Sequence, residues 1–135
     1  MTVETEQHCD FMHVDFSATG LWYGQCTKGR ASGMGYGVVR DAGGGSMEYI
    51  GNTSRGLASG TGAMIIRLVG KSGASYFAGE FLHGQPDGVL IVEETGKPSG
   101  LRKFKNGEDK GKGDSSLLKT LSFASGWSKP DSLIP

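Results

Sequence analysis

The chain has 135 residues, the length of one domain and enough to bury a hydrophobic core. Its 14 lysine and arginine residues balance 14 aspartate and glutamate residues, so we expect no overall field that attracts nucleic acid or an anionic membrane. Glycine occurs 24 times, but without a three-residue period and together with aromatic and β-branched residues, which argues against collagen and against simple disorder.

The first residues, TVETEQ, are acidic and polar and do not resemble a signal peptide. The longest apolar stretches, around Ala63–Val69 and Val89–Val92, are far shorter than the roughly 20 residues that span a bilayer. Two cysteines, Cys9 and Cys26, are too few for a disulfide framework. These features predict a cytoplasmic, soluble protein without a transmembrane segment.

Residues 1–16 are interpreted as an N-terminal tail with a candidate leading strand over Phe11–Phe16, where apolar and polar residues alternate. His8, Cys9, Asp10 and His13 are four potential metal ligands within six residues. Strand alternation places His8 and Asp10 on one side and the other two on the opposite side, and no second cluster completes a tetrahedral site. We therefore predict no metal and no cofactor.

Residues 17–113 contain an internal repeat. Glycines recur in register at 24, 51 and 79, at 29, 56 and 84, and at 33, 60 and 88, with offsets of 27 and then 28 residues. A decayed fourth copy keeps Phe104, Gly107 and Gly111. Each copy has the pattern of a β-hairpin with a glycine turn, and glycine-rich and serine-rich segments separate the copies. The fold class predicted is all-β, an antiparallel meander of about eight strands that is strongly twisted or curled.

Side chains alternate between the two faces of a strand, so parity assigns each residue to a face. One face collects most of the large apolar residues, with glycines between them that leave room for aromatic rings: Trp22, Cys26, Tyr49, Thr53, Met64, Ile66, Leu68, Phe77, Phe81, Leu90, Val92 and Phe104. Because Cys26 replaces a core aromatic, we expect it to be an inert buried thiol.

The repeat resembles the MORN repeat over roughly residues 21–113. The third copy matches most closely, with Phe77, Gly79, Glu80, Phe81, Gly84 and Gly88. The first copy has Gln25 and Cys26, and the second Asn52 and Thr53, where the family favours an acid and an aromatic residue. The resemblance implies an interaction or scaffold module that docks a protein partner or associates with itself.

Residues 114–135 are predicted to form a C-terminal cap and tail. Asp114 is a candidate helix N-cap, and Leu117, Leu118 and Leu121 then share one helical face. Such a helix would cover a sheet edge or an apolar face, and Trp127, Leu133 and Ile134 would extend that cover or bind a partner.

The opposite face is mixed and is where we expect function. Gln25, Asn52, Glu80 and Lys103 occupy equivalent positions in successive hairpins, about 10 Å apart. Glu80 is the only carboxylate of this row, which makes it the candidate catalytic acid or base or a ligand anchor. The candidate ligand-binding residues on the same face are Tyr23, Gln25, Tyr36, Asn52, Arg67 and Tyr76.

Two functional classes therefore remain open, besides a weaker third. The first is the docking module. The second is a small stand-alone enzyme of isomerase or cyclase type, or a small-molecule-binding protein, that uses the curved face around Glu80. The third is weak contact with phospholipid head groups through a late basic cluster, interspersed with acids that favour a self-neutralising edge: Lys97, Arg102, Lys103, Lys105, Lys110 and Lys112.

Overall fold

The computed structural model describes residues 9–11, 18–41, 43–70, 72–95 and 100–114. These residues form nine strands: β1 (Ala18–Thr27), β2 (Arg30–Asp41), β3 (Ser46–Ser54), β4 (Leu57–Arg67), β5 (Ser75–Leu82), β6 (Gln85–Pro86), β7 (Gly88–Glu94), β8 (Gly100–Lys105) and β9 (Glu108–Lys112). Both the predicted C-terminal helix and residues 12–16 of the candidate leading strand lie outside the described residues.

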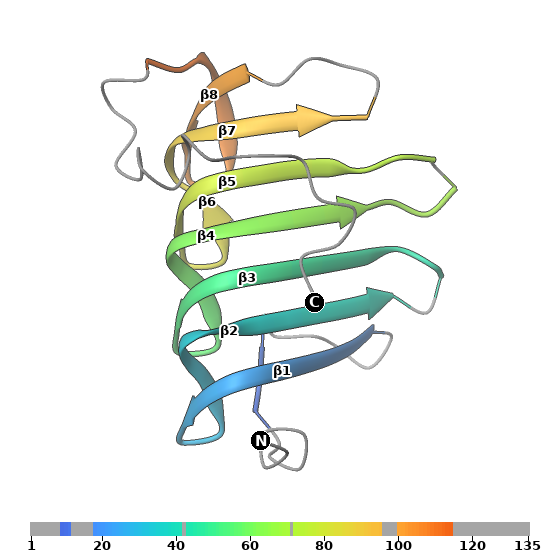
Figure 1. Ribbon diagram of the computed structural model, residues 1–135, viewed down its shortest axis with the longest axis vertical. Coiled ribbons are helices and arrows are strands. Elements are labelled where there is room, and N and C mark those ends of the chain that lie inside the picture. The colour runs from blue at the N-terminus through green and yellow to red at the C-terminus, as the bar shows by residue number, and fades with distance from the viewer. Residues whose placement is uncertain (1–8, 12–17, 42, 71, 96–99, 115–135) are drawn as a thin grey trace.

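The strands form one antiparallel sheet in the order β1-β2-β3-β4-β5-β7-β8-β9, with the short β6 paired to β5 (Figure 1). β1 and β9 are the two ends of this path, so the sheet is an open meander, and the predicted fold class is confirmed. The second strand of the third hairpin is divided into β6 and β7 at Asp87, directly after Pro86, which lacks a backbone N–H. This division explains why nine strands occur where about eight were expected.

Four hairpin turns share one backbone conformation. In each turn a residue with φ of 52–53° precedes a glycine with φ between 76° and 84°: Lys28–Gly29, Arg55–Gly56, His83–Gly84 and Asn106–Gly107. Two successive positive φ angles define the type I′ turn, whose twist matches that of the flanking strands. Each of the first three turns is also hydrogen-bonded to the next. The N–H of Gly56 donates to Ala31 O (3.0 Å), and the N–H of Gly84 donates to Ala58 O (2.9 Å).

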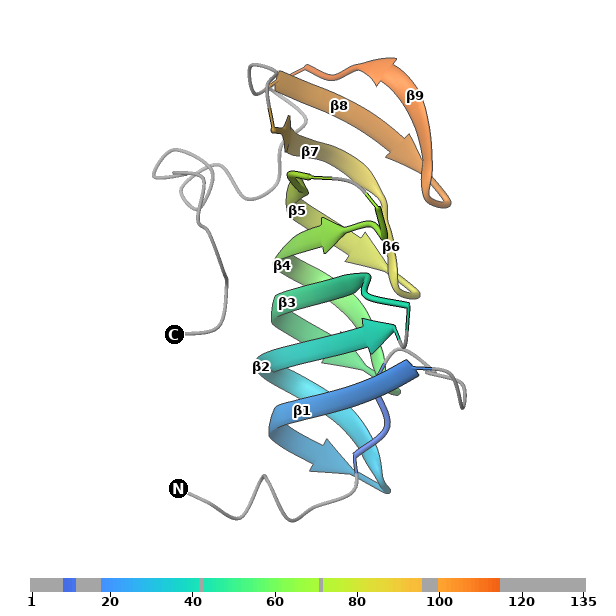
Figure 2. The same cartoon turned by 90° about the vertical axis from the view of Figure 1, so that its right-hand side faces the viewer.

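The sheet bends across its strands along one line, so that it forms a trough (Figure 2). A row of paired glycines crosses five strands, Gly24, Gly35, Gly51, Gly62 and Gly79. Aromatic rings lie on this row. The Trp22 ring extends over Gly24 and Gly35 and donates its Nε1–H to Gln25 O (2.7 Å), and the Tyr49 ring extends over Gly51 and Gly62. A β-carbon at these glycines would collide with the rings, so glycine here serves packing, as predicted.

The face that carries these rings, here called the inner face, contains the main hydrophobic core. Half of the twelve residues that parity assigned to it are buried in this core: Trp22, Tyr49, Met64, Phe81, Leu90 and Phe104. The cross-strand series Trp22, Gly37, Tyr49, Met64, Phe77 and Val92 confirms that these residues share one side of the sheet. The opposite side, here called the outer face, has its own buried residues, including Val38, Ile65, Tyr76 and Val89.

The N-terminal segment Cys9–Phe11 closes the first end of the trough. Asp10 bridges to Arg30, with its N–H donating to Gly29 O (2.7 Å) and its carbonyl accepting from Ala31 N (2.9 Å). Phe11 is 1% exposed and stacks on Trp22, with ring centroids 5.2 Å apart. Its ring lies against Gly37, where a β-carbon would collide with it. The segment therefore completes the core of the first hairpin.

Cys9 and Cys26 form a disulfide. The prediction of an inert buried thiol at Cys26 is therefore wrong. The physical reason is that the segment before the repeats returns onto the inner face, where it brings the Cys9 sulfur beside the position that an aromatic residue would otherwise fill. A disulfide-bonded Cys9 also has no thiolate to offer a metal.

Candidate functional site

The predicted site residues lie on the outer face, in rows that cross the sheet. Asn52 on β3 pairs with Met34, Glu80 on β5 pairs with Thr61, and Lys103 on β8 pairs with Val89. Successive members are thus separated by two strands, or about 10 Å. Gln25 belongs to the same row on β1, and its side chain lies beside Gly33.

Glu80 is held by its cross-strand neighbour. The Thr61 hydroxyl donates to Glu80 Oε2 at 2.9 Å, and the Glu80 side chain is half-buried. One carboxylate oxygen is therefore committed to a neutral donor within the sheet, and the other offers an acceptor toward the outer face. This arrangement can hold a cationic or hydroxyl group of a ligand.

The other candidate residues of the outer face occupy different parts of it. Tyr23 and Tyr36 form a direct cross-strand pair between β1 and β2. Tyr76 pairs with Ile65 and is 5% exposed. Arg67 donates to Glu48 Oε2 at 2.8 Å, a salt bridge between β4 and β3.

These residues form a strip instead of one pocket. Tyr76 and Glu80 are four residues apart on β5, a separation of about 13 Å, and the Tyr23–Tyr36 pair lies three to four strands from Glu80, about 14–19 Å away. None of them lines the two cavities that share Glu94 or the cavity between Lys28 and Arg55. The strip suits contact with an extended surface better than enclosure of a small molecule.

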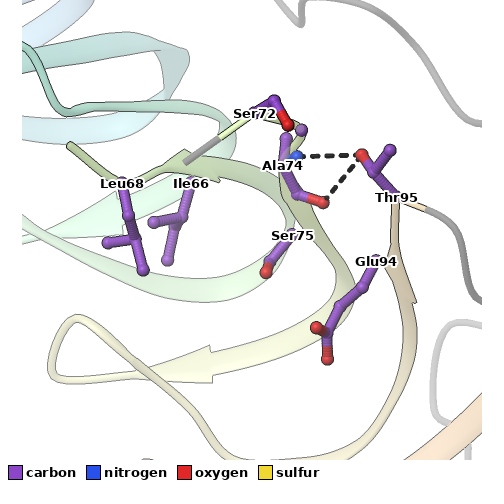
Figure 3. Close-up of a pocket in the computed structure, with 8 residues that line it drawn as sticks. Ile66, Leu68, Ser72, Ala74, Ser75, Glu94 and Thr95 are labelled. Carbon is purple, nitrogen blue, oxygen red and sulfur yellow. Dashed lines mark hydrogen bonds between the residues drawn. The ribbon is translucent and has the colours of Figure 1, made fainter. Parts of the chain in front are cut away.

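A groove runs over the inner face at the strand ends remote from the type I′ turns. Its first part is a cavity of ≈ 150 Å³ between the β4–β5 connection and the end of β7, lined by Ile66, Leu68, Ser75, Glu94 and Thr95 among others (Figure 3). Ile66 and Leu68 project side by side, and Glu94 and Thr95 form the opposite wall (Figure 3). Thr95 Oγ1 accepts from the Ala74 N–H (2.9 Å), which ties the two walls together.

The second part is a cavity of ≈ 470 Å³ that shares Glu94 with the first and extends to Val92, Leu101, Arg102, Asp109 and Lys112. We call the two cavities together the Glu94 groove. Its far wall is polar, because the Arg102 guanidinium donates to both Asp109 oxygens, at 3.0–3.2 Å. These hydrogen bonds from Arg102 hold the pKa of Asp109 below its ordinary value, with help from the Gly111 N–H.

Parity assigns Ile66, Leu68 and Val92 to the inner face and predicts that they belong to its core. Leu68 is 59% exposed, and the neighbouring Val69 is 53% exposed. Parity alone carries no signal for this groove, because residues 72–74 and Thr95, which lie outside the strands, line part of it. The SG pair at 72–73 and the TG pair at 95–96 indicate only turns in the sequence.

The remaining sequence predictions concern a cluster of potential metal ligands and a late basic cluster. No group of three or more His, Cys, Asp or Glu side chains able to hold a metal occurs among the described residues. His8 and His13 lie outside those residues, as does Lys97. In the late basic cluster, Arg102 pairs with Asp109 and Lys110 with Glu108 (3.4 Å), which is the self-neutralising arrangement expected for that edge.

The fold and the groove define the protein as an open sheet of repeated β-hairpins with an N-terminal disulfide cap. A comparison with protein-family models, curated proteins and solved structures found no match to the chain. The resemblance to the MORN repeat therefore stays a prediction from the spaced glycines and aromatic residues. The described part of the chain contains no helix with the length and hydropathy needed to span a bilayer.

Proposed function

We propose that this protein is an interaction module that docks a segment of a partner protein in the Glu94 groove. The single observation that carries the proposal is the exposed Leu68 beside Ile66, at the mouth of a groove on a sheet that stays open. An apolar side chain of the partner would cover Ile66 and Leu68, and a hydrogen-bond donor or cation would meet Glu94.

The composition of the groove supports a protein segment as the occupant. Apolar side chains line one wall and charged side chains the other, and the core of an interface is typically apolar with a polar rim. Exposed apolar patches that are rimmed by polar residues commonly mark protein interaction sites. Association with a second copy of the chain is the competing form of the same proposal.

The test compares two charge substitutions at exposed leucines. Leu68→Glu changes the groove, whereas Leu82→Glu changes a leucine that is 43% exposed at the opposite, type I′ turn ends of the strands. Native mass spectrometry of each protein with cell extract should show a stoichiometric protein partner on the wild type and on Leu82→Glu but not on Leu68→Glu. Retention of the partner by Leu68→Glu overturns the groove as its site.

Two further outcomes distinguish the alternatives. A concentration-dependent dimer in sedimentation that Leu68→Glu abolishes would assign the groove to self-association. A retained small molecule instead of a partner would favour the alternative function, an enzyme or small-molecule-binding protein at Glu80. The predicted cytoplasmic location stays a prediction, and the Cys9–Cys26 disulfide argues for an oxidising compartment instead.

A further inference from the structure

A third cavity lies between the first two type I′ turns, on the opposite side of the molecule from the Glu94 groove along the strands. Its volume is ≈ 440 Å³. Three cationic residues, Lys28, Arg30 and Arg55, and three hydroxyl residues, Thr27, Ser32 and Ser54, line it. The hydrogen bond from Gly56 N–H to Ala31 O holds the two turns at this spacing, so the cations come from two hairpins that are adjacent in space.

The three cations gather without neutralisation. Within the described residues, no ion pair or hydrogen bond involves the side chain of Lys28, Arg30 or Arg55, whereas Arg67 and Arg102 elsewhere on the sheet are each paired with an acid. Like charges brought together at one site repel, and a bound anion relieves that repulsion.

Asp10 is the acid to consider beside this cavity. Its backbone joins Gly29 and Ala31, and its Oδ2 lies 3.7 Å from the position of a β-carbon at Gly56. Asp10 does not line the cavity and has interactions of its own. Among the described residues, this single carboxylate at the margin leaves a net positive charge on the residues that line the cavity.

The turn backbone does not require this cluster. The third and fourth turns have the same φ angles but place His83 and Asn106 where the first two have Lys28 and Arg55. At the fourth turn an acid is present instead, since the Asn106 N–H donates to Asp87 Oδ1 (3.4 Å). The positive charge is therefore a property of the first two repeats and not of the repeat as such.

We propose that this cavity binds a phosphate or sulfate ester group of a small soluble ligand. Guanidinium groups donate paired hydrogen bonds to tetrahedral oxyanions, and Lys28 adds a point charge. The hydroxyls of Thr27, Ser32 and Ser54 supply further donors. The volume falls within the range of roughly 300–1,000 Å³ that is usual for small-ligand sites, so the cavity accommodates the group that carries the ester as well as the anion.

The test uses inorganic pyrophosphate and inorganic sulfate as probes, with the full chain in its disulfide-bonded form at about 0.1 M ionic strength, where the Debye length is about 10 Å. Isothermal titration calorimetry measures the affinity, and backbone amide NMR locates the site. We expect the largest shifts at Lys28, Arg30 and Arg55. We expect Arg30→Gln/Arg55→Gln to weaken pyrophosphate binding at least about tenfold, a loss of about 1.4 kcal/mol.

The matched control is Arg40→Gln/Lys105→Gln, which removes two exposed positive charges, one near the end of β2 remote from its type I′ turn and one from β8, both away from the cavity. This control should change the affinity less than about twofold, because exposed charges beyond a Debye length are largely screened. Arg30→Lys/Arg55→Lys keeps the charge but not the paired donors. Its affinity for pyrophosphate should lie between that of the wild type and that of the glutamine variant. The melting temperature of each variant establishes that it folds.

Three results with the soluble anions overturn the proposal. They are the absence of binding by either probe to the wild type, an equal loss of affinity in the Arg40→Gln/Lys105→Gln control, and NMR shifts confined to other parts of the sheet. Vesicles that contain phosphatidic acid distinguish the source of the ester. Binding to vesicles without binding of either soluble anion would also overturn it, because the proposed ligand is soluble.

Discussion

The Tyr49 ring lies against Gly62 on the neighbouring strand, where a β-carbon would come within 2.5 Å of Tyr49 Cε1. Tyr49 is fully buried, and its hydroxyl donates to Asn52 O at 2.7 Å, so the ring spans the bend of its own strand. Trp22 makes the equivalent contact in the first repeat, with Gly35 beneath it and Gln25 O as its acceptor. An aromatic ring, the glycine it covers and the bend of the sheet are therefore one structural unit.

The first prediction tests this unit by adding a single methyl group. Gly62→Ala should lower the free energy of unfolding by about 2 kcal/mol, because an extra carbon in a packed core forces the ring or the backbone to move. Gly100→Ala is the matched control, since Gly100 is also in a strand and a β-carbon there would meet no atom within 4 Å. For Gly100→Ala, urea unfolding should show a change in the free energy of unfolding of less than about 0.5 kcal/mol. Equal effects of the two substitutions would contradict the packing role.

The second prediction concerns the disulfide between Cys9 and Cys26, which are separated by 17 residues. Closing a loop of this size stabilises a domain by about 3 kcal/mol, mainly by restricting the unfolded chain. Cys9→Ser/Cys26→Ser should therefore lower the melting temperature, and dithiothreitol should lower that of the wild type to the same value. The wild type should have no thiol available for labelling before reduction. A melting temperature insensitive to dithiothreitol would contradict this prediction.

The strands and their faces were predictable because two local rules dominate them. Side chains alternate with a period of two, and the glycines at 24, 51 and 79 repeat at a nearly fixed offset, so the row of large apolar residues from Trp22 to Phe104 could be assigned from the sequence alone. Both rules act within a hairpin or between neighbouring hairpins. The sequence alone was therefore sufficient to predict the parts of the structure that depend on such local patterns.

The disulfide and the cavities were not predictable by those rules. Cys9 lies before the repeats, and only the return of its segment onto the inner face brings it to Cys26. The Glu94 groove is lined in part by residues 72–74 and by Thr95, which lie outside the strands and whose positions no periodic pattern specifies. The Thr61–Glu80 hydrogen bond was only partly predictable. Parity places both residues on the same face, but it does not fix the strand register that brings them opposite each other.

The third prediction addresses Glu80. Glu80→Gln preserves an oxygen acceptor for the Thr61 hydroxyl, so the fold and the melting temperature should remain close to those of the wild type. If the outer face binds a small molecule, this substitution should weaken binding or slow turnover while Lys103→Gln in the same row changes it less. Titration of any retained ligand measures the effect. Unaltered ligand binding in Glu80→Gln would remove Glu80 from the site.

The fourth prediction follows from the buried phenol of Tyr49. Burial raises the pKa of Tyr49, and the nearby negative charge of Glu80 raises it further. The folded protein therefore favours the neutral phenol. Below pH about 10, the ordinary tyrosine value, the phenol is neutral in both states, and the contribution of Tyr49 to stability is fully present. As the pH rises above that value, the unfolded chain loses its proton first and the contribution declines.

Tyr49→Phe removes both the titrating group and its hydrogen bond to Asn52 O. At pH 7 the variant should be less stable than the wild type by about 1 kcal/mol, the usual worth of one buried hydrogen bond. Between about pH 9 and 11 the wild type should lose stability relative to the variant, so the difference should narrow and then reverse. Urea unfolding at a series of pH values measures it. A difference that stays constant over this range would show that Tyr49 ionises as readily in the folded protein as in the unfolded chain.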